Sequence, residues 1–176
     1  LLDITTRTGT ARNIKYPMIG MPSEQLKFGV YDVAQNKTIY LNITDFTNER
    51  YLTNPAWSPD SKTIYIQVMN REQKALNLNA YDAITGEFKA TLLSESNPHF
   101  LEPNQPIIFL DNHRFIYTTD NRDGYYNLYL YSLKTNTLTR ITRVNADVEY
   151  LTHDAQHIYY YSFEVSPAER HLFRVN

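Results

Sequence analysis

The sequence predicts an all-β fold built from repeated four-stranded antiparallel sheets. Two different strand–turn–strand phrases alternate along the chain at an interval of about 50 residues. Within the phrases apolar and polar residues alternate with period two, the pattern of a half-buried strand, and polar turn residues separate the strands. The chain also holds 15 Tyr and 8 Phe among its 176 residues. Strands accommodate such residues well because one face of the ring packs while a Tyr hydroxyl reaches water.

The first phrase occurs three times as an aromatic strand, a short turn and a second strand. Its copies are VYDVAQNKTIYLN, AYDAITGEFKATL and LYSLKTNTLTRIT, each 50 residues after the one before. The equivalent aromatic positions are Tyr31, Tyr81, Tyr131 and, where a fourth copy begins, Phe173. Gly86 and Asn136 supply the backbone freedom that a tight turn needs. We expect each copy to form the outer hairpin of a four-stranded unit.

The second phrase is a short apolar strand, a polar turn with Asp and a strand that begins near Ile-Tyr. Its copies are WSPDSKTIYIQV, FLDNHRFIYTT and YLTHDAQHIYYYS. We take their common register from Ile64, Ile116 and Ile158, which are spaced 52 and 42 residues apart. We expect Asp60 to close its turn through its own backbone, as Asp does in tight turns. This phrase is predicted to form the inner hairpin.

Together the two phrases make four strands in about 40 to 50 residues, which is the period of one β-propeller blade. We therefore predict a partial β-propeller of about three and a half blades from a larger ring of about eight blades. Residues 1–48 end one blade, 49–98 and 99–145 each form a blade, and 146–176 form an incomplete blade. So few blades cannot close a ring, and the chain begins without Met. We expect it to be a slice of a longer propeller.

Composition excludes several classes of function. The formal net charge is -2 and the pI is about 6.2, whereas a nucleic-acid partner requires concentrated Lys and Arg. The chain has no Cys, which excludes disulfides, a thiolate zinc site and a Cys nucleophile. No apolar run is long enough for a transmembrane helix. We expect no nucleic-acid partner and no membrane span in this segment.

Motifs for catalysis are not found in the sequence. There is no GxSxG elbow, and the five Gly are scattered rather than grouped in a phosphate-binding loop. His153 and His157 are four residues apart, which suits a metal on a helix, but they fall in a strand–turn–strand phrase. Ser58, Ser132 and Ser162 have no base partner nearby in the sequence. We expect no catalytic residue, no metal and no cofactor in this segment.

Three stretches carry motifs beyond the repeat. Residues 14–32, IKYPMIGMPSEQLKFGVYD, contain Tyr-Pro-x-x-Gly before a strand that leads into VYD. Residues 51–88 contain WSPD and the first whole repeat, and residues 120–132, DNRDGYYNLYLYS, contain an acidic residue, Gly-Tyr and an aromatic-rich strand. In this order and spacing they resemble the propeller of bacterial members of the dipeptidyl peptidase IV family. The resemblance covers essentially the whole chain.

The resemblance implies a function for the parent protein. Members of this family are serine exopeptidases that release dipeptides from peptide N-termini, with Pro or Ala favoured at the second position. They join the propeller to a C-terminal α/β-hydrolase domain that holds the Ser-Asp-His triad. The paired Glu that binds the free amine lies in an earlier propeller segment. Members act as homodimers, and bacterial members are periplasmic or secreted. This chain alone is therefore expected to be inactive.

The resemblance also implies a place for substrate contact. The link HFLEPNQP, residues 99–106, is similar to a family segment in which an aromatic residue and an Arg reach toward the extended S2 pocket. Leu101 and Glu102 occupy those two places here, and Phe100 lies beside them. Phe100, Leu101 and Glu102 are therefore candidates for the pocket rim, although the Arg is absent.

Two alternatives remain open at this point. A stand-alone periplasmic module of the propeller type could bind proteins or glycans, and a complete small β-sandwich could have the same length. A reading frame that continues past Asn176 into a GxSxG segment would favour the peptidase. A β-sandwich predicts a stable monomer, whereas a propeller slice with open strand edges predicts self-association.

Overall fold

The described part of the chain consists of strands and turns, so the all-β prediction is confirmed. The computed structural model describes residues 1–15, 20–46 and 49–176. The Tyr-Pro pair of residues 16–17 and the predicted boundary at residue 48 lie outside the described residues. No helix in the described ranges is long and apolar enough to cross a membrane.

Fifteen strands form five antiparallel sheets in the described residues. The strands are β1 (Leu2–Asp3), β2 (Thr10–Ala11), β3 (Gly29–Asp32), β4 (Lys37–Tyr40), β5 (Arg50–Trp57), β6 (Thr63–Asn70), β7 (Ala75–Asp82), β8 (Phe88–Ser96), β9 (Ile108–Phe109), β10 (Arg114–Thr119), β11 (Asn127–Ser132), β12 (Thr137–Arg140), β13 (Val148–His153), β14 (Ile158–Ser166) and β15 (Glu169–Val175). Strands β5–β8 and β9–β12 form four-stranded sheets, β13–β15 a three-stranded sheet, and β1–β2 and β3–β4 hairpins. Within each sheet, the strands that pair are consecutive in the sequence, so every connection within a sheet is short.

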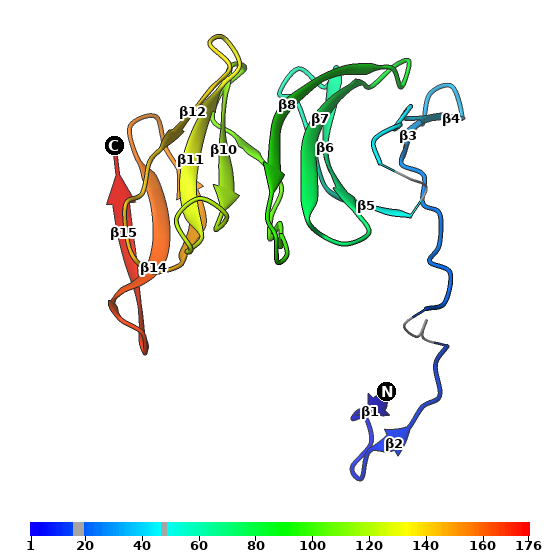
Figure 1. The fold of residues 1–176 in the computed structure, drawn as a ribbon, viewed down its shortest axis with the longest axis horizontal. Coiled ribbons are helices and arrows are strands. Elements are labelled where there is room, and N and C mark those ends of the chain that lie inside the picture. The colour runs from blue at the N-terminus through cyan, green and yellow to red at the C-terminus, as the bar shows by residue number, and fades with distance from the viewer. Residues whose placement is uncertain (16–19, 47–48) are drawn as a thin grey trace.

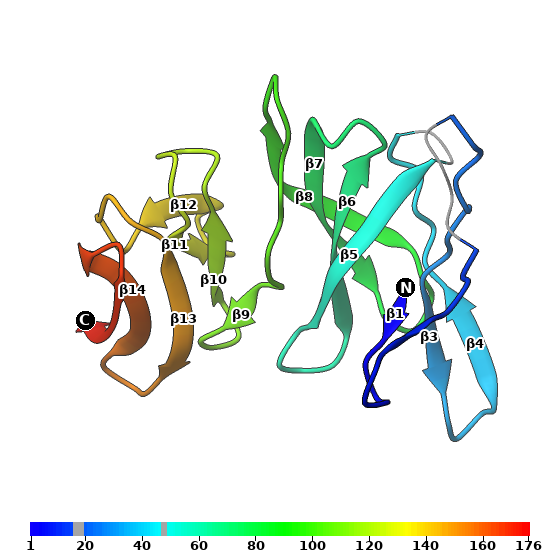
Figure 2. The same cartoon turned by 90° about the horizontal axis from the view of Figure 1, so that it is seen from below.

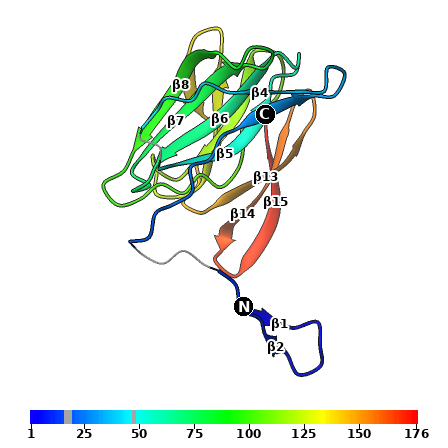
Figure 3. The same ribbon diagram turned by 90° about the vertical axis from the view of Figure 1, so that its right-hand side faces the viewer.

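The sheets follow one another in chain order, face to face (Figure 1). Seen from below, the β5–β8 sheet lies between the β3–β4 hairpin and the β9–β12 sheet (Figure 2). The β1–β2 hairpin stands away from this stack (Figure 1, Figure 3). The main body is therefore a row of similar sheets with one projecting hairpin.

The hydrophobic core is divided into layers between successive sheets. The first layer joins Leu41 and Ile43, which follow β4, to Ile64 and other residues of the β5–β8 sheet. In the next layer Tyr65 and Leu78 of that sheet meet the Phe115 face of the β9–β12 sheet. The third layer joins Ile116, Leu128 and Val148 with residues of β14. Each central sheet buries both of its faces, so no sheet could hide its apolar residues alone.

The hairpin turns repeat one hydrogen-bonding device. The Oδ1 atom of Asp60 accepts hydrogen bonds from the Ser58 hydroxyl (2.6 Å) and from the backbone N–H of Lys62 (3.1 Å), so the predicted turn role of Asp60 is confirmed. Asp111 and Asp154 accept from the backbone two residues later in the same way, at 2.8 and 2.7 Å. Local bonds of this kind fix a turn without help from the rest of the fold.

The outer hairpins turn at equivalent positions, as predicted. Asn36, Gly86 and Asn136 have φ angles of 52°, 78° and 52°, and they are spaced 50 residues apart. A positive φ is the left-handed region that Gly and Asn adopt most readily. The repeated turn residue therefore has a backbone cause.

The aromatic marks of the first phrase have equivalent surroundings. Tyr81, Tyr131 and Phe173 lie on β7, β11 and β15 and pair across the ladder with Ile64, Phe115 and Tyr160. All three pack toward the preceding sheet. Tyr31 occupies the same place on β3 but is 55% exposed, because the described residues place no sheet on that side of it.

The prediction that Ile64, Ile116 and Ile158 share one register is wrong at Ile116. Ile64 and Ile158 pack toward the preceding sheet, but Ile116 packs toward the following one. The segment from Phe115 to its partner Tyr131 is one residue shorter than the segment from Ile64 to Tyr81. Since side chains alternate between the two faces of a strand, a change of one residue moves the isoleucine to the opposite face. Phe115 is the true counterpart of Ile64.

The β7–β8 turn at Gly86 contacts the preceding β3–β4 hairpin and the residues that follow it. The carbonyl oxygen of Gly86 accepts a hydrogen bond from the backbone N–H of Asn42 (2.8 Å). A Cβ atom added at Gly86 would lie 2.3 Å from the carbonyl oxygen of Tyr40. Gly86 is required here both for its φ of 78° and for this close approach.

Replacing Gly86 by Ala should therefore lower stability more than the same change elsewhere. We expect Gly86→Ala to lower the free energy of unfolding by about 2–4 kcal/mol, from backbone strain and the clash with Tyr40. Gly124→Ala is the matched control, because Gly124 has a φ of 77° but nothing within 4 Å of an added Cβ, and it should cost about 1–2 kcal/mol. Urea unfolding midpoints measure both. Equal losses would contradict the close approach.

Acid should weaken the turn at Asp82. Backbone N–H groups of Thr85 and Ile84, followed by Lys89, lower the pKa of Asp82 to about 2. Because the folded pKa lies below the unfolded value, this contribution to stability is present above about pH 4 and is lost as the pH falls toward 2. Asp82→Asn keeps an acceptor oxygen but cannot titrate. We expect the variant to show a smaller fall in melting temperature between pH 5 and pH 2, and an unchanged fall would contradict this role.

Candidate functional site

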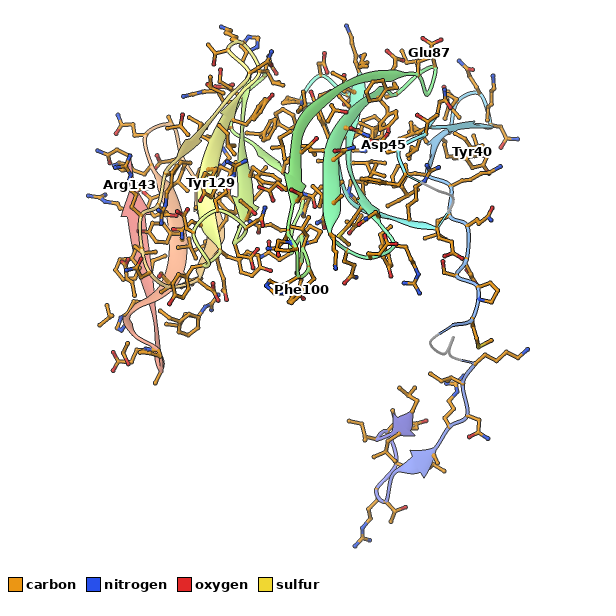
Figure 4. All side chains as sticks on the ribbon, viewed as in Figure 1. Tyr40, Asp45, Glu87, Phe100, Tyr129 and Arg143 are labelled. Atoms are coloured by element: carbon orange, nitrogen blue, oxygen red, sulfur yellow. The ribbon has the colours of Figure 1, made fainter. Side chains whose placement is uncertain are left out.

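The three predicted rim residues lie together on one surface hollow. Phe100, Leu101 and Glu102 belong to the link between β8 and β9, and they border a hollow of about 380 Å³. The other residues that line it are Tyr51, Thr53, Met69, Gln73 and Pro103. Phe100 lies at the opposite end of the β5–β8 sheet from Glu87 in the β7–β8 turn (Figure 4). The hollow therefore lies where the chain passes from one sheet to the next.

The three residues differ in their surroundings. Leu101 is buried, at 4% exposure, and packs with Met69 and Leu76. Its backbone N–H donates to the carbonyl oxygen of Gln73 (2.6 Å). Phe100 is 58% exposed and Glu102 is also exposed. Leu101 thus anchors the link, while Phe100 and Glu102 are the two of these three residues whose side chains are exposed beside the hollow.

Side chains from both neighbouring sheets hold the link. The bonds run from Asn54 Nδ2 to Pro103 O (3.0 Å), from Gln67 Nε2 to Gln105 O (3.4 Å), from Tyr126 Oη to Glu102 O (2.8 Å) and from Asn97 Nδ2 to Asn121 Oδ1 (2.9 Å). Asn54 and Gln67 belong to the β5–β8 sheet, and Tyr126 immediately precedes β11. The link has no strand pairing of its own before β9, so these bonds fix its path.

A buried carboxylate lies beside this link. The side chain of Glu95, at the end of β8, is 4% exposed and pairs with Arg122 at 3.3 Å. It also accepts hydrogen bonds from the hydroxyls of Tyr117 (3.1 Å) and Thr119 (2.8 Å) of β10. Burial, and then the charge of Glu95, raises the pKa of Tyr117 well above its ordinary value. Glu95 is therefore an ionic and hydrogen-bonding link between two sheets.

Negative charge gathers near the exposed end of the link. Burial raises the pKa of Asp120, and the carboxylates of Asp147 and Glu102 raise it further. The same three acids, after burial, raise the pKa of Tyr126 to about 12. The hydroxyl of Tyr126 is therefore a neutral donor at ordinary pH.

The histidine pair forms separate local contacts. His153 Nδ1 lies 2.7 Å from the Tyr150 hydroxyl, and His157 Nδ1 lies 3.4 Å from Asp154. No group of three His, Asp or Glu side chains in the described residues is placed to hold a metal ion. Ser58, one of the three serines considered, donates its hydroxyl to Asp60 in a turn.

Sequence reasoning missed the polar residues that organise the link. Asn54, Gln67 and Glu95 lie within strands β5, β6 and β8, where their partners are distant in the sequence. Gln67 at 1% exposure is the clearest case, because it lies in the continuous apolar run of β6. A polar residue in such a run was the available signal, since buried polar groups need partners.

The stack of antiparallel sheets defines the chain as part of a β-propeller, which confirms the predicted fold class. Residues 2–176 match the family described as the dipeptidyl peptidase IV (DPP IV) N-terminal region. The chain belongs to this family. The predicted kinship with dipeptidyl peptidase IV is thus confirmed over almost the whole sequence.

Solved structures of bacterial proteins agree with this assignment. A putative dipeptidyl aminopeptidase IV from Bacteroides ovatus is 34% identical, with a TM-score of 0.79, over 97% of this chain and 29% of that chain. Porphyromonas gingivalis dipeptidyl peptidase 4 shares the fold at 22% identity and a TM-score of 0.80, over 98% of this chain and 25% of that chain. TolB from Acinetobacter baumannii is more distant in fold, with 17% identity and a TM-score of 0.58, over 84% of this chain and 34% of that chain. This chain spans less than a third of the first two proteins.

Removing the buried carboxylate should loosen the two central sheets. We expect Glu95→Ala to lower the free energy of unfolding by about 2–4 kcal/mol, because the buried hydroxyls of Tyr117 and Thr119 lose their acceptor. Glu87→Ala, in an exposed turn, is the control and should change stability by less than about 0.5 kcal/mol. Chemical unfolding measures both. A loss at Glu95 no larger than at Glu87 would contradict its role between the sheets.

Proposed function

We propose that this chain is a non-catalytic propeller segment of a serine exopeptidase that removes N-terminal dipeptides with Pro or Ala at the second position. In this proposal the segment gates and positions peptides for an α/β-hydrolase domain of the same protein. The single observation that carries the proposal is the 34% identity, over 97% of this chain, to a protein described as a putative dipeptidyl aminopeptidase IV. The chemistry of bond cleavage then belongs to the remainder of the protein.

The outermost faces of the stack support a place within a longer series of blades. On β3, Val30 packs inward, so the alternating Tyr31 lies on the far face and is 55% exposed. On β15, Phe173 packs inward and the alternating Leu172 is 57% exposed. Apolar side chains on both outer faces are what blades need in order to pack against further blades of the same kind.

The geometry of the link suits a positioning role. Phe100 and Glu102 are exposed beside the hollow, while Leu101 and the bonds from two sheets hold the backbone between them. A loop held by rigid strands can keep a peptide at a fixed distance from a reacting group. A propeller in front of a hydrolase site would also admit flexible peptides and reject folded proteins. We propose that the parent protein is a homodimer and is periplasmic or secreted.

The isolated chain should not cleave a Gly-Pro chromogenic dipeptide. The reason is that the proposed nucleophile lies in another domain. Release of the chromophore is followed with purified chain, and a serine-directed phosphonate is the control for contaminating peptidase. Turnover that the phosphonate abolishes and that copurifies with the chain would contradict the proposal. A reading frame that ends soon after Asn176, without a hydrolase domain, would instead favour a stand-alone binding module.

The rim can be tested in the full-length protein. We expect Phe100→Ala to raise KM for an N-terminal Xaa-Pro peptide by about three-fold to ten-fold, because an exposed aromatic contact is lost, and to leave kcat within about two-fold. Phe88→Ala is a control, because Phe88 is similarly exposed, at 47%, but lies on β8 away from the hollow. An unchanged KM for Phe100→Ala would remove the rim from the proposed function.

A further inference from the structure

Two consecutive carbonyl groups of the link are held from opposite sheets. The oxygen of Glu102 accepts a hydrogen bond from the Tyr126 hydroxyl (2.8 Å), and the oxygen of Pro103 accepts one from Asn54 Nδ2 (3.0 Å). Tyr126 immediately precedes β11, and Asn54 lies in β5. Because the bonds come from two sheets, the peptide between Glu102 and Pro103 is fixed with respect to both sheets. This peptide directly follows Phe100 and Leu101.

Tyr126 is itself held in place. Its backbone N–H donates to Asp147 Oδ1 (2.9 Å), and its carbonyl oxygen accepts from the N–H of Val148 (2.8 Å). Val148 begins β13 of the three-stranded sheet. The phenol is half-buried and has a raised pKa of about 12, so its hydroxyl keeps its proton. The donor to Glu102 is therefore preorganised.

Asn54 is placed by an irregularity in its strand. The pairing of β5 with β6 shifts between Thr53 and Ala56, and Asn54 has a φ of 53°. Asn is the residue, after Gly, that most readily adopts this conformation. Its Nδ2 atom also donates to Oε1 of the buried Gln67 (2.8 Å). The bulge turns the side chain of Asn54, on the edge strand β5, toward the link.

These contacts are separate from those that join the two central sheets. The β5–β8 and β9–β12 sheets are already joined by an apolar layer and by the Glu95 cluster. The bonds from Tyr126 and Asn54 instead end on the two backbone carbonyls next to the exposed Phe100 and Glu102 side chains. We propose that Tyr126 and Asn54 are positioning residues, which set the position of the Phe100–Glu102 rim and thereby the affinity for a peptide that enters the hollow.

The inference rests on the proposed function, and it concerns binding rather than bond cleavage. Neither side chain needs to touch the substrate. A shift of the rim should weaken peptide binding in the ground state and the transition state alike, which raises KM and leaves kcat nearly constant. A merely structural role would lower the melting temperature and leave KM unchanged at temperatures where the protein is folded.

The test uses the full-length protein with an N-terminal Xaa-Pro peptide, well below the melting temperature of every variant. Tyr126→Phe removes one hydroxyl, and we expect KM to rise by about three-fold to ten-fold with kcat within about two-fold. Tyr125→Phe is the matched control, because its hydroxyl makes no bond to the described residues of the link, and it should leave both constants unchanged. Asn54→Asp keeps the shape but cannot donate to Pro103, and it should resemble Tyr126→Phe.

A double variant separates this inference from the proposed function. If Tyr126 acts through the rim, adding Tyr126→Phe to Phe100→Ala should raise KM by less than about two-fold further. Independent, multiplied effects would overturn the positioning role. So would an unchanged KM for Tyr126→Phe when Phe100→Ala still raises KM, and in that case the proposed function survives. An unchanged KM for Phe100→Ala overturns the rim and the positioning role together.

Discussion

The structure depends on the burial of apolar side chains between successive sheets. Each four-stranded sheet has two apolar faces, and neither is covered within its own sheet. On β6, Ile64 packs toward the preceding hairpin and Tyr65 packs toward the following sheet. Because successive sheets pack against one another, a loop that connects two sheets is held by contacts with both of them. The link that carries Phe100 gains its rigidity from this arrangement rather than from pairing of its own.

Polar groups then determine how adjacent sheets are aligned with each other. Apolar layers resist separation but allow small shifts, whereas hydrogen bonds to buried groups demand one alignment. Glu95 reaches from β8 to Tyr117 and Thr119 of β10, and Asn54 reaches from β5 to the link. Both therefore join the β5–β8 sheet to chain segments that follow it in the sequence. These polar contacts fix the alignment of the β5–β8 sheet with β10 and with the link that carries Phe100.

The parts of this architecture that could be predicted are those with local causes. Asp60 closes its turn through a bond to the nearby Lys62, and Gly86 is a residue type that is typical of turns. The place of Ile116 could not be predicted, because a change of one residue in one hairpin reverses its face and leaves the pattern almost unaltered. The roles of Asn54 and Tyr126 were also hidden, since their partners lie 49 and 24 residues away. Periodicity identifies a strand, but it does not identify which side chain crosses to another sheet.

The close contact at Gly86 has a consequence for how far the repeated units can be exchanged for one another. The equivalent turn position in the next unit is Asn136, which carries a Cβ atom. A side chain at Gly86 would clash with the backbone of Tyr40 in the preceding hairpin. The turn at Gly86 therefore approaches its neighbouring hairpin more closely than a turn with Asn at this position could. Units that look alike in sequence are therefore not interchangeable. An averaged unit with Asn at both turn positions would lose the close approach between Gly86 and Tyr40.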